Sequence, residues 1–166
     1  MEIKEGTLEG KECRVGIVVS KFNEFITTRL MNSALETLHK AGVEDDNIDA
    51  VRVPGAFEIP LVARHLARSR QYDAVICLGA VIRGETPHFD YISAEMSRGI
   101  AQASWDTGIP IVFGVLTTNT AAQALERSGA PEKNRGADAA RTAIEMATLM
   151  KTLLDSDRNA TGFRQS

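Results

Sequence analysis

The chain has few of the residues that build disulfide frameworks or metal centres. It contains only two cysteines in 166 residues, Cys13 and Cys77, and no CxxC spacing. Both lie beside apolar runs, so we expect buried, unreactive thiols with no role in a metal site or a disulfide. The sequence also lacks a Gly-rich P-loop and a GxGxxG run, so no motif indicates nucleotide binding.

A dominant charge and a long hydrophobic run are missing as well. The formal net charge is −3 at pH 7, which makes nucleic acid and anionic membranes poor candidate partners and favours a small-molecule ligand. No apolar run approaches the roughly 20 residues of a membrane span. The polar residues 1–12 do not have the basic-then-apolar layout of a signal peptide. We therefore expect a cytoplasmic protein.

What the sequence does contain is the pattern of one α/β domain. Four apolar runs rich in β-branched residues alternate with amphipathic segments of helical length, which is typical of parallel strands covered on both faces. We expect a three-layer αβα sandwich with a four-stranded parallel sheet of the flavodoxin-like type, with its core in about residues 7–154. The strands are expected at residues 13–20, 48–55, 74–82 and 109–117.

The helices are expected between and after these strands. Thr86 is predicted to cap the third helix with Pro87 in its first position, and Thr120 with Gln123 predicts a capping box at the start of the fourth. Residues 155–166 are expected to form a loose tail after the last helix. Apolar spacing predicts the helices at about residues 26–38, 60–66, 87–107, 120–127 and 136–154.

Ligands of such sheets bind beyond the carboxyl ends of the strands, so the loops there, at residues 21–25, 54–58, 81–88 and 114–119, are the places to look for chemistry. The loop with the sequence GETPH, residues 84–88, precedes a helix whose free N–H groups and dipole could bind an anion such as phosphate. His88 could relay protons beside it. The alternatives are an ordinary Thr-Pro helix start and a capping or surface histidine.

Other loops carry side chains suited to a polar, flat ligand. Glu58, after the second strand, could accept hydrogen bonds from a polyol, or could merely complement a helix dipole. Phe22 or Phe25 could stack on a heterocycle, or either could be a hydrophobic staple. Taken alone, Phe57 and Phe113 are expected in the core. Arg127 is suited to phosphate, but could also be a solvated arginine or a partner of Asp138.

Four longer segments, taken together and in order, resemble one family. GIVVSKFNEFIT, VPGAFEIP, LGAVIRGETPHFDYI and GVLTTNTAAQALERSG are similar to the 6,7-dimethyl-8-ribityllumazine synthases, and the similarity runs over roughly residues 7–154. The resemblance implies condensation of 5-amino-6-(D-ribitylamino)uracil with 3,4-dihydroxy-2-butanone 4-phosphate, with release of phosphate and water, in riboflavin biosynthesis. It implies no metal and no organic cofactor.

The resemblance also implies a role for each site residue. Phe22 would stack on the pyrimidine, and His88 would transfer protons. Phe113 and Arg127 would come from the neighbouring subunit. The remaining residues would hold the ribityl chain (Ala56, Phe57 and Glu58), the uracil edge (Ala80, Val81 and Ile82) and, with Arg127, the phosphate (Glu85 and Thr86).

The family's oligomers set the expected partners. A homopentamer is implied, with the N-terminal segment joining a neighbouring subunit, and twelve pentamers can form a hollow shell that holds riboflavin synthase. The segment APEKNRG, residues 130–136, departs from the commoner TKAGNKG, so a second phosphate contact could be Lys133, Arg135 or neither. It has no extra residues, which favours the shell. The rival functions are a noncatalytic flavin- or lumazine-binding protein and a flavodoxin-like electron carrier.

Overall fold

A four-stranded parallel sheet forms the centre of the chain. The structure is a computed structural model that describes residues 1–162. The strands β1 (Val15–Ser20), β2 (Ile48–Val53), β3 (Ala74–Ile82) and β4 (Ile111–Thr118) lie in the order β2-β1-β3-β4. Every neighbouring pair is parallel. The predicted strand positions are confirmed to within two residues at each end.

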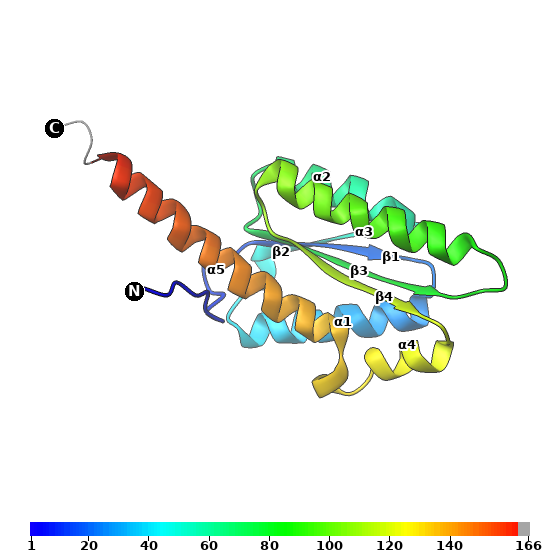
Figure 1. The fold of residues 1–166 in the computed structure, drawn as a ribbon. Coiled ribbons are helices and arrows are strands. Elements are labelled where there is room, and N and C mark those ends of the chain that lie inside the picture. The colour runs from blue at the N-terminus through cyan, green and yellow to red at the C-terminus, as the bar shows by residue number, and fades with distance from the viewer. Residues whose placement is uncertain (163–166) are drawn as a thin grey trace.

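Helices cover both faces of the sheet, as Figure 1 shows. On one face lie α1 (Glu24–Lys40), α4 (Ala121–Arg127) and α5 (Arg135–Gly162). The other face carries α2 (Ile59–Arg68) and α3 (His88–Thr107). Two separate sets of buried apolar residues fill the two interfaces. The three-layer αβα sandwich predicted from the sequence is therefore confirmed.

The inner strands explain why the apolar runs could be read as parallel strands. All six residues of β1 are buried, as are the first seven residues of β3. A strand between two helical layers has no solvent face, so it cannot alternate polar and apolar residues. The outer strands β2 and β4 are partly exposed, and Phe113 in β4 is 46% exposed rather than part of the core.

The helix starts confirm one cap and contradict another. At α4, the Thr120 hydroxyl accepts a hydrogen bond from the backbone N–H of Gln123, and the Gln123 side chain accepts one from the N–H of Asn119. The predicted cap of α3 is wrong, because α3 begins at His88 and Thr86 makes no capping hydrogen bond. Pro87 takes the position before the helix, and its carbonyl accepts the hydrogen bond from Asp90 instead.

The expectation of a loose C-terminal tail is wrong for residues 155–162, which continue α5. No proline or glycine interrupts the sequence between Gly136 and Gly162, so the helix can propagate past the last apolar residues. The Ser156 hydroxyl donates to the carbonyl of Thr152 at 2.9 Å and accepts from Lys4 at 2.8 Å. In Figure 1 this part of α5 projects from the body of the molecule. Residues 163–166 of the expected tail lie outside the described part.

The N-terminal residues pack along α5 within the same chain. The backbone N–H of Thr7 donates to Thr148 at 2.8 Å, and Lys151 pairs with Glu12 at 2.9 Å. The joining of this segment to a neighbouring subunit stays a prediction. Among residues 1–162, no helix is both long and apolar enough to cross a lipid bilayer.

Both cysteines are buried and unpaired, as expected. Burial raises the pKa of the Cys77 thiol far above its usual range, and burial also raises that of Cys13. A thiol held neutral in this way is a poor nucleophile.

Candidate active site

A cavity of about 520 Å³ opens at the carboxyl ends of β1 and β3. The chain leaves β1 towards β2 on one side and returns to β3 on the other, so the loops after β1 and β3 diverge. Such a switch point is where open parallel sheets bind ligands. The cavity is lined by Phe22, Pro54, Gly55, Ala56, Phe57, Glu58, Ala80, Val81, Ile82, Gly84, Thr86, His88, Phe89 and Ile92.

Nine of the twelve site residues named from the sequence line this cavity. They come from three separate stretches of the chain, at 22, at 56–58 and at 80–88. Glu85 is exposed between two lining residues, Gly84 and Thr86, and is not itself part of the lining. Phe113 and Arg127 lie elsewhere. The loop at 114–119, also expected to contribute, does not reach the cavity.

The strand register leaves backbone groups of β3 free at the cavity. β1 pairs with β3 only as far as Val19 opposite Leu78, whereas β4 continues to pair with β3 up to Ile82. Ala80, Val81 and Ile82 therefore present an edge with no strand partner on the β1 side. Unpaired backbone donors and acceptors at a strand edge can hydrogen-bond a flat heterocycle.

The loop after β1 brings an aromatic ring to the cavity. Phe22 is 71% exposed, and its backbone N–H donates to the carbonyl of Pro54 at 3.1 Å. Phe25, the alternative stacking residue, is exposed on α1 and does not line the cavity. Of the two rings that the sequence offers for stacking, only Phe22 therefore lies at the cavity.

Asn23 fixes this loop and was missed in the sequence. Its φ of 59° places it in the left-handed region, where asparagine is tolerated better than most residues. Its side-chain N–H donates to the carbonyl of Ala80 at 2.9 Å, which ties the loop after β1 to the end of β3. In the sequence, the only signal for this role is an asparagine between an expected strand and an expected helix. That signal does not identify the carbonyl of Ala80 as its hydrogen-bond partner.

Glu58 combines a local structural bond with a free acceptor. Residues Ala56–Glu58 form a short 3-10 helix before α2. The Oε2 atom of Glu58 accepts a hydrogen bond from the backbone N–H of Gly55 at 2.9 Å. Within residues 1–162 the Oε1 atom has no hydrogen-bond partner, so it remains available to a hydroxyl group. Phe57 beside it is 56% exposed and is not a core residue.

The loop before α3 presents free donors and a histidine. Within the described chain, the backbone N–H groups of Gly84, Glu85 and Thr86 donate to no protein acceptor. They lie at the N-terminal end of a 20-residue helix, whose dipole favours an anion. His88, the first residue of α3, is exposed, and its ring has no hydrogen bond or ion pair to the described residues. Its ring nitrogens are therefore open to a ligand.

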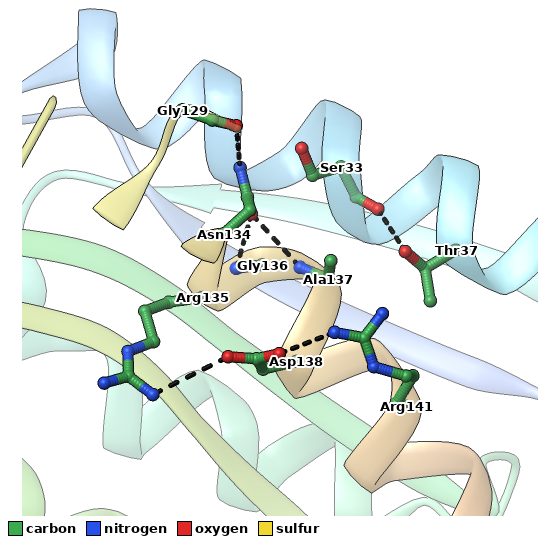
Figure 2. A network of polar contacts seen from close by, with 9 residues as sticks. All are labelled: Ser33, Thr37, Gly129, Asn134, Arg135, Gly136, Ala137, Asp138 and Arg141. Carbon is green, nitrogen blue, oxygen red and sulfur yellow. Dashed lines mark hydrogen bonds and ion pairs between the residues drawn. The ribbon is translucent and has the colours of Figure 1, made fainter. Parts of the chain in front are cut away.

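Phe113 and Arg127 border two adjoining hollows, both away from the cavity. Phe113 borders one hollow and the half-buried Arg127 borders another, and both hollows share Arg135 and Asp138. The suggested pairing of Arg127 with Asp138 is wrong. Asp138 pairs instead with Arg141 at 2.6 Å and with Arg135 at 3.6 Å, as Figure 2 shows.

A fully buried asparagine shapes this second region. The Asn134 side chain accepts hydrogen bonds from the N–H groups of Gly136 and Ala137, and donates to the carbonyls of Ser128 and Gly129. Figure 2 shows it between the start of α5 and the preceding loop. Asn134 therefore fixes the segment that follows Arg127. Lys133, on the same segment, pairs with Glu126 at 3.1 Å.

No metal-ligand group accompanies these residues. Within residues 1–162, no set of three or more histidine, cysteine or acidic side chains lies close enough to hold an ion. The arrangement instead offers a stacking ring, a strand edge, a carboxylate, an anion-binding loop and a histidine.

Known proteins match this chain along almost its whole length. The family model for 6,7-dimethyl-8-ribityllumazine synthase matches residues 12–151. The chain is 58% identical over 151 residues to the 6,7-dimethyl-8-ribityllumazine synthase of Syntrophus aciditrophicus (strain SB), an alignment covering 91% of this chain and 98% of that protein. It is 54% identical over 153 residues to the enzyme of the same name from Clostridium kluyveri, covering 92% of this chain and 99% of the relative.

Proposed function

Because this chain belongs to the 6,7-dimethyl-8-ribityllumazine synthase family, we propose that its 520 Å³ cavity is where the lumazine is formed. The reaction is the condensation of 5-amino-6-(D-ribitylamino)uracil with 3,4-dihydroxy-2-butanone 4-phosphate, a transferase step of riboflavin biosynthesis. The observation that carries the proposal is the meeting of Phe22, Glu58, the free edge of β3 and His88 in one cavity.

The pyrimidine occupies the part of the cavity between the loop after β1 and the end of β3. Phe22 stacks on the ring, and the end of β3 at Ala80, Val81 and Ile82, which has no strand partner on the β1 side, hydrogen-bonds its uracil edge. The ribityl chain runs along Ala56 and Phe57 to Glu58. The free Oε1 atom of Glu58 supports this assignment, since a carboxylate oxygen accepts readily from hydroxyl groups.

The phosphate lies at the N-terminal end of α3. The backbone N–H groups of Glu85 and Thr86, which donate to no acceptor in the described chain, bind its oxygens. The dipole of α3 stabilises the negative charge there. His88 is one turn from this position, so it can carry protons between the phosphate-bearing carbon chain and the pyrimidine amine.

The chemistry needs positioning and proton transfer more than a strong nucleophile. The 5-amino group attacks the ketone and releases water to form an imine. Loss of phosphate follows by elimination, and attack of the ribityl-bearing nitrogen then closes the ring with loss of water. Holding the two reactants together lowers the barrier by several kcal/mol. This agrees with the inertness of Cys13 and Cys77, whose thiols are buried with raised pKa values.

Phe113 and Arg127 complete the site of the next subunit in a homopentamer. The two side chains border hollows that share Arg135 and Asp138, and neither lines the cavity of its own chain, which supports a role across an interface. Within the described chain Arg127 has no ion pair, so its guanidinium is available to phosphate. The two unpaired thiols fit a reducing compartment, so we place the enzyme in the cytoplasm.

The pentamers assemble further into a hollow shell of twelve, with riboflavin synthase as its partner. The support is the short segment between α4 and α5, residues 128–134, in which Pro131–Lys133 forms a 3-10 helix. Light scattering of the purified protein separates a single pentamer from a shell.

The deciding experiment mixes the purified oligomer with both substrates and follows lumazine fluorescence and phosphate release. We expect rapid formation of both products, and a loss of about 10²-fold in rate for His88→Ala. His65→Ala, on α2 and away from the cavity, is the matched control and should keep the parent rate. An oligomer that does not exceed the uncatalysed rate would leave a noncatalytic lumazine-binding protein as the better account.

A further inference from the structure

Arg83 is held on three sides by parts of the chain that meet only in the fold. Its Nε atom donates to the side-chain oxygen of Asn119 at 3.0 Å, and its Nη1 atom lies 3.3 Å from a carboxylate oxygen of Asp90. The guanidinium carbon is 4.4 Å from the centre of the Phe89 ring. The backbone N–H of Arg83 donates to the carbonyl of Thr118 at 2.8 Å. One residue therefore joins the end of β3, the loop after β4 and the first turn of α3.

These contacts bracket the loop that we assign to phosphate. Residues 84–87 connect Arg83 to α3, and Phe89 and Asp90 are the second and third residues of that helix. Within residues 1–162, Gly84, Glu85 and Thr86 make no hydrogen bond of their own. The place of the loop is therefore set by its two ends, and Arg83 connects them directly.

We propose that Arg83 is a positioning residue that holds this loop and His88 in place for the phosphate-bearing substrate. Arg83 does not line the cavity, whereas Phe89, on which it stacks, does. It acts through Phe89, Asp90 and Asn119 and does not touch the substrate. This inference rests on the proposed function of the cavity.

Arginine suits this position for a geometric reason. Its planar fork can donate in two directions while its face lies on an aromatic ring. Asp90 and Asn119 take the two directions, and Phe89 takes the face. A lysine at this position would have a single ammonium group and could not make all three contacts.

The test is steady-state kinetics of Arg83→Met in the intact oligomer, with each substrate varied in turn. We expect KM for the phosphate substrate to rise about tenfold and kcat to fall severalfold, with KM for the pyrimidine within about twofold of the parent. Inhibition by inorganic phosphate should weaken by a similar factor. Arg98→Met is the matched control, because Arg98 lies on α3, pairs with Glu95 at 2.7 Å and does not line the cavity. It should leave all three constants unchanged.

A double-mutant cycle separates positioning from direct contact. Asn119→Ala removes one partner of Arg83 and leaves the guanidinium in place, so we expect a smaller rise in the same KM and a non-additive effect with Arg83→Met. An unchanged KM in Asn119→Ala, together with a raised KM in Arg83→Met, would overturn the positioning role.

An active parent whose Arg83→Met variant keeps its KM for the phosphate substrate overturns this inference alone. A parent that makes no lumazine overturns the proposed function and the inference with it. Should Arg83→Met fail to assemble, Arg83→Lys, which keeps the charge beside Asp90, takes its place in the same comparison.

Discussion

The side-chain oxygen of Asn134 accepts a hydrogen bond from the backbone N–H of Gly136 at 2.8 Å, two residues further along the chain. The same oxygen accepts from the N–H of Ala137, so it satisfies two of the donors that the start of α5 would otherwise leave unpaired. The side-chain nitrogen binds two carbonyls of the preceding loop. A side chain with no exposed surface thus fixes both the helix start and the loop.

Replacing Asn134 by alanine should therefore destabilise the protein. The variant leaves backbone donors and a carbonyl buried without partners, and we expect a loss of about 2–4 kcal/mol in the free energy of unfolding. Urea unfolding at one fixed protein concentration measures it. Asn32→Ala, at an exposed position on α1, should change the same quantity by less than about 0.5 kcal/mol. Equal effects of the two substitutions would contradict the role assigned to Asn134.

Gly136 is required by the close approach of α5 to α1. A Cβ atom at this position would collide with the backbone carbonyl of Leu30, which cannot rotate away as a side chain could. We expect Gly136→Ala to cost about 1–3 kcal/mol or more, measured by the same unfolding experiment. At Gly84 a Cβ would meet nothing within 4 Å, so Gly84→Ala should leave stability nearly unchanged. A stable Gly136→Ala protein would show that the two helices can separate without cost.

Asp49 should make stability depend on pH at the end of the sheet opposite the cavity. Hydrogen bonds from the Tyr72 hydroxyl, at 2.8 Å, and from Arg14, at 3.1 Å, lower the pKa of the Asp49 carboxyl. The unfolded chain has the ordinary value of about 3.9. A carboxyl with a lower pKa in the folded state stabilises the fold above the unfolded value, and this contribution is lost as pH falls through the folded value.

The measurement is the difference in unfolding midpoint between the parent and Asp49→Asn. It should be largest near neutral pH and should shrink below about pH 4, because the parent carboxylate then becomes protonated. Asp46→Asn is the control, since Asp46 is exposed and has no hydrogen bond or ion pair to the described residues. A difference for Asp49→Asn that stays constant from pH 7 to pH 3 would show that its charge has no part in stability.

The sheet and most of the cavity were predictable because they follow from local pattern and parallel topology. An inner strand such as β1 has no solvent face, so its apolar run identifies it. The carboxyl ends of neighbouring parallel strands lie at one edge, so residues after β1, β2 and β3 had to meet there. Phe22, Glu58 and His88, far apart in sequence, share one cavity for this reason.

What could not be predicted depends on contacts between distant segments. Asn23 binds Ala80, and Arg83 binds Asn119, in each case across a separation of 36 residues or more. Such a bond requires the strand register and the loop conformation together, and neither is encoded at one position. The continuation of α5 to Gly162 was missed for the opposite reason, because local helix propagation outlasts the apolar periodicity used to find the helix.

An interface site makes a sharp prediction for mixed oligomers. Both His88→Ala and Arg127→Ala should be nearly inactive alone, since the first removes the proton carrier and the second removes the phosphate contact. If His88 and Arg127 act in one site but come from neighbouring subunits, a ring built from both variants contains some sites with neither defect. Such a site takes its cavity from an Arg127→Ala subunit and its arginine from a His88→Ala subunit.

When equal amounts of the two variants assemble at random, the subunit that supplies the cavity is the Arg127→Ala variant with a probability of one half. The neighbour that supplies the arginine is the His88→Ala variant with the same probability. About a quarter of the sites should therefore be intact, and co-expressed variants should recover about a quarter of the parent activity. The matched control mixes His88→Ala with Phe22→Ala, whose side chains line the same cavity of one chain, and should recover nothing. If the first mixture also stayed inactive while still forming mixed rings, Arg127 would have to act on the cavity of its own chain. That arrangement would require α4 to move away from its observed place beside β4.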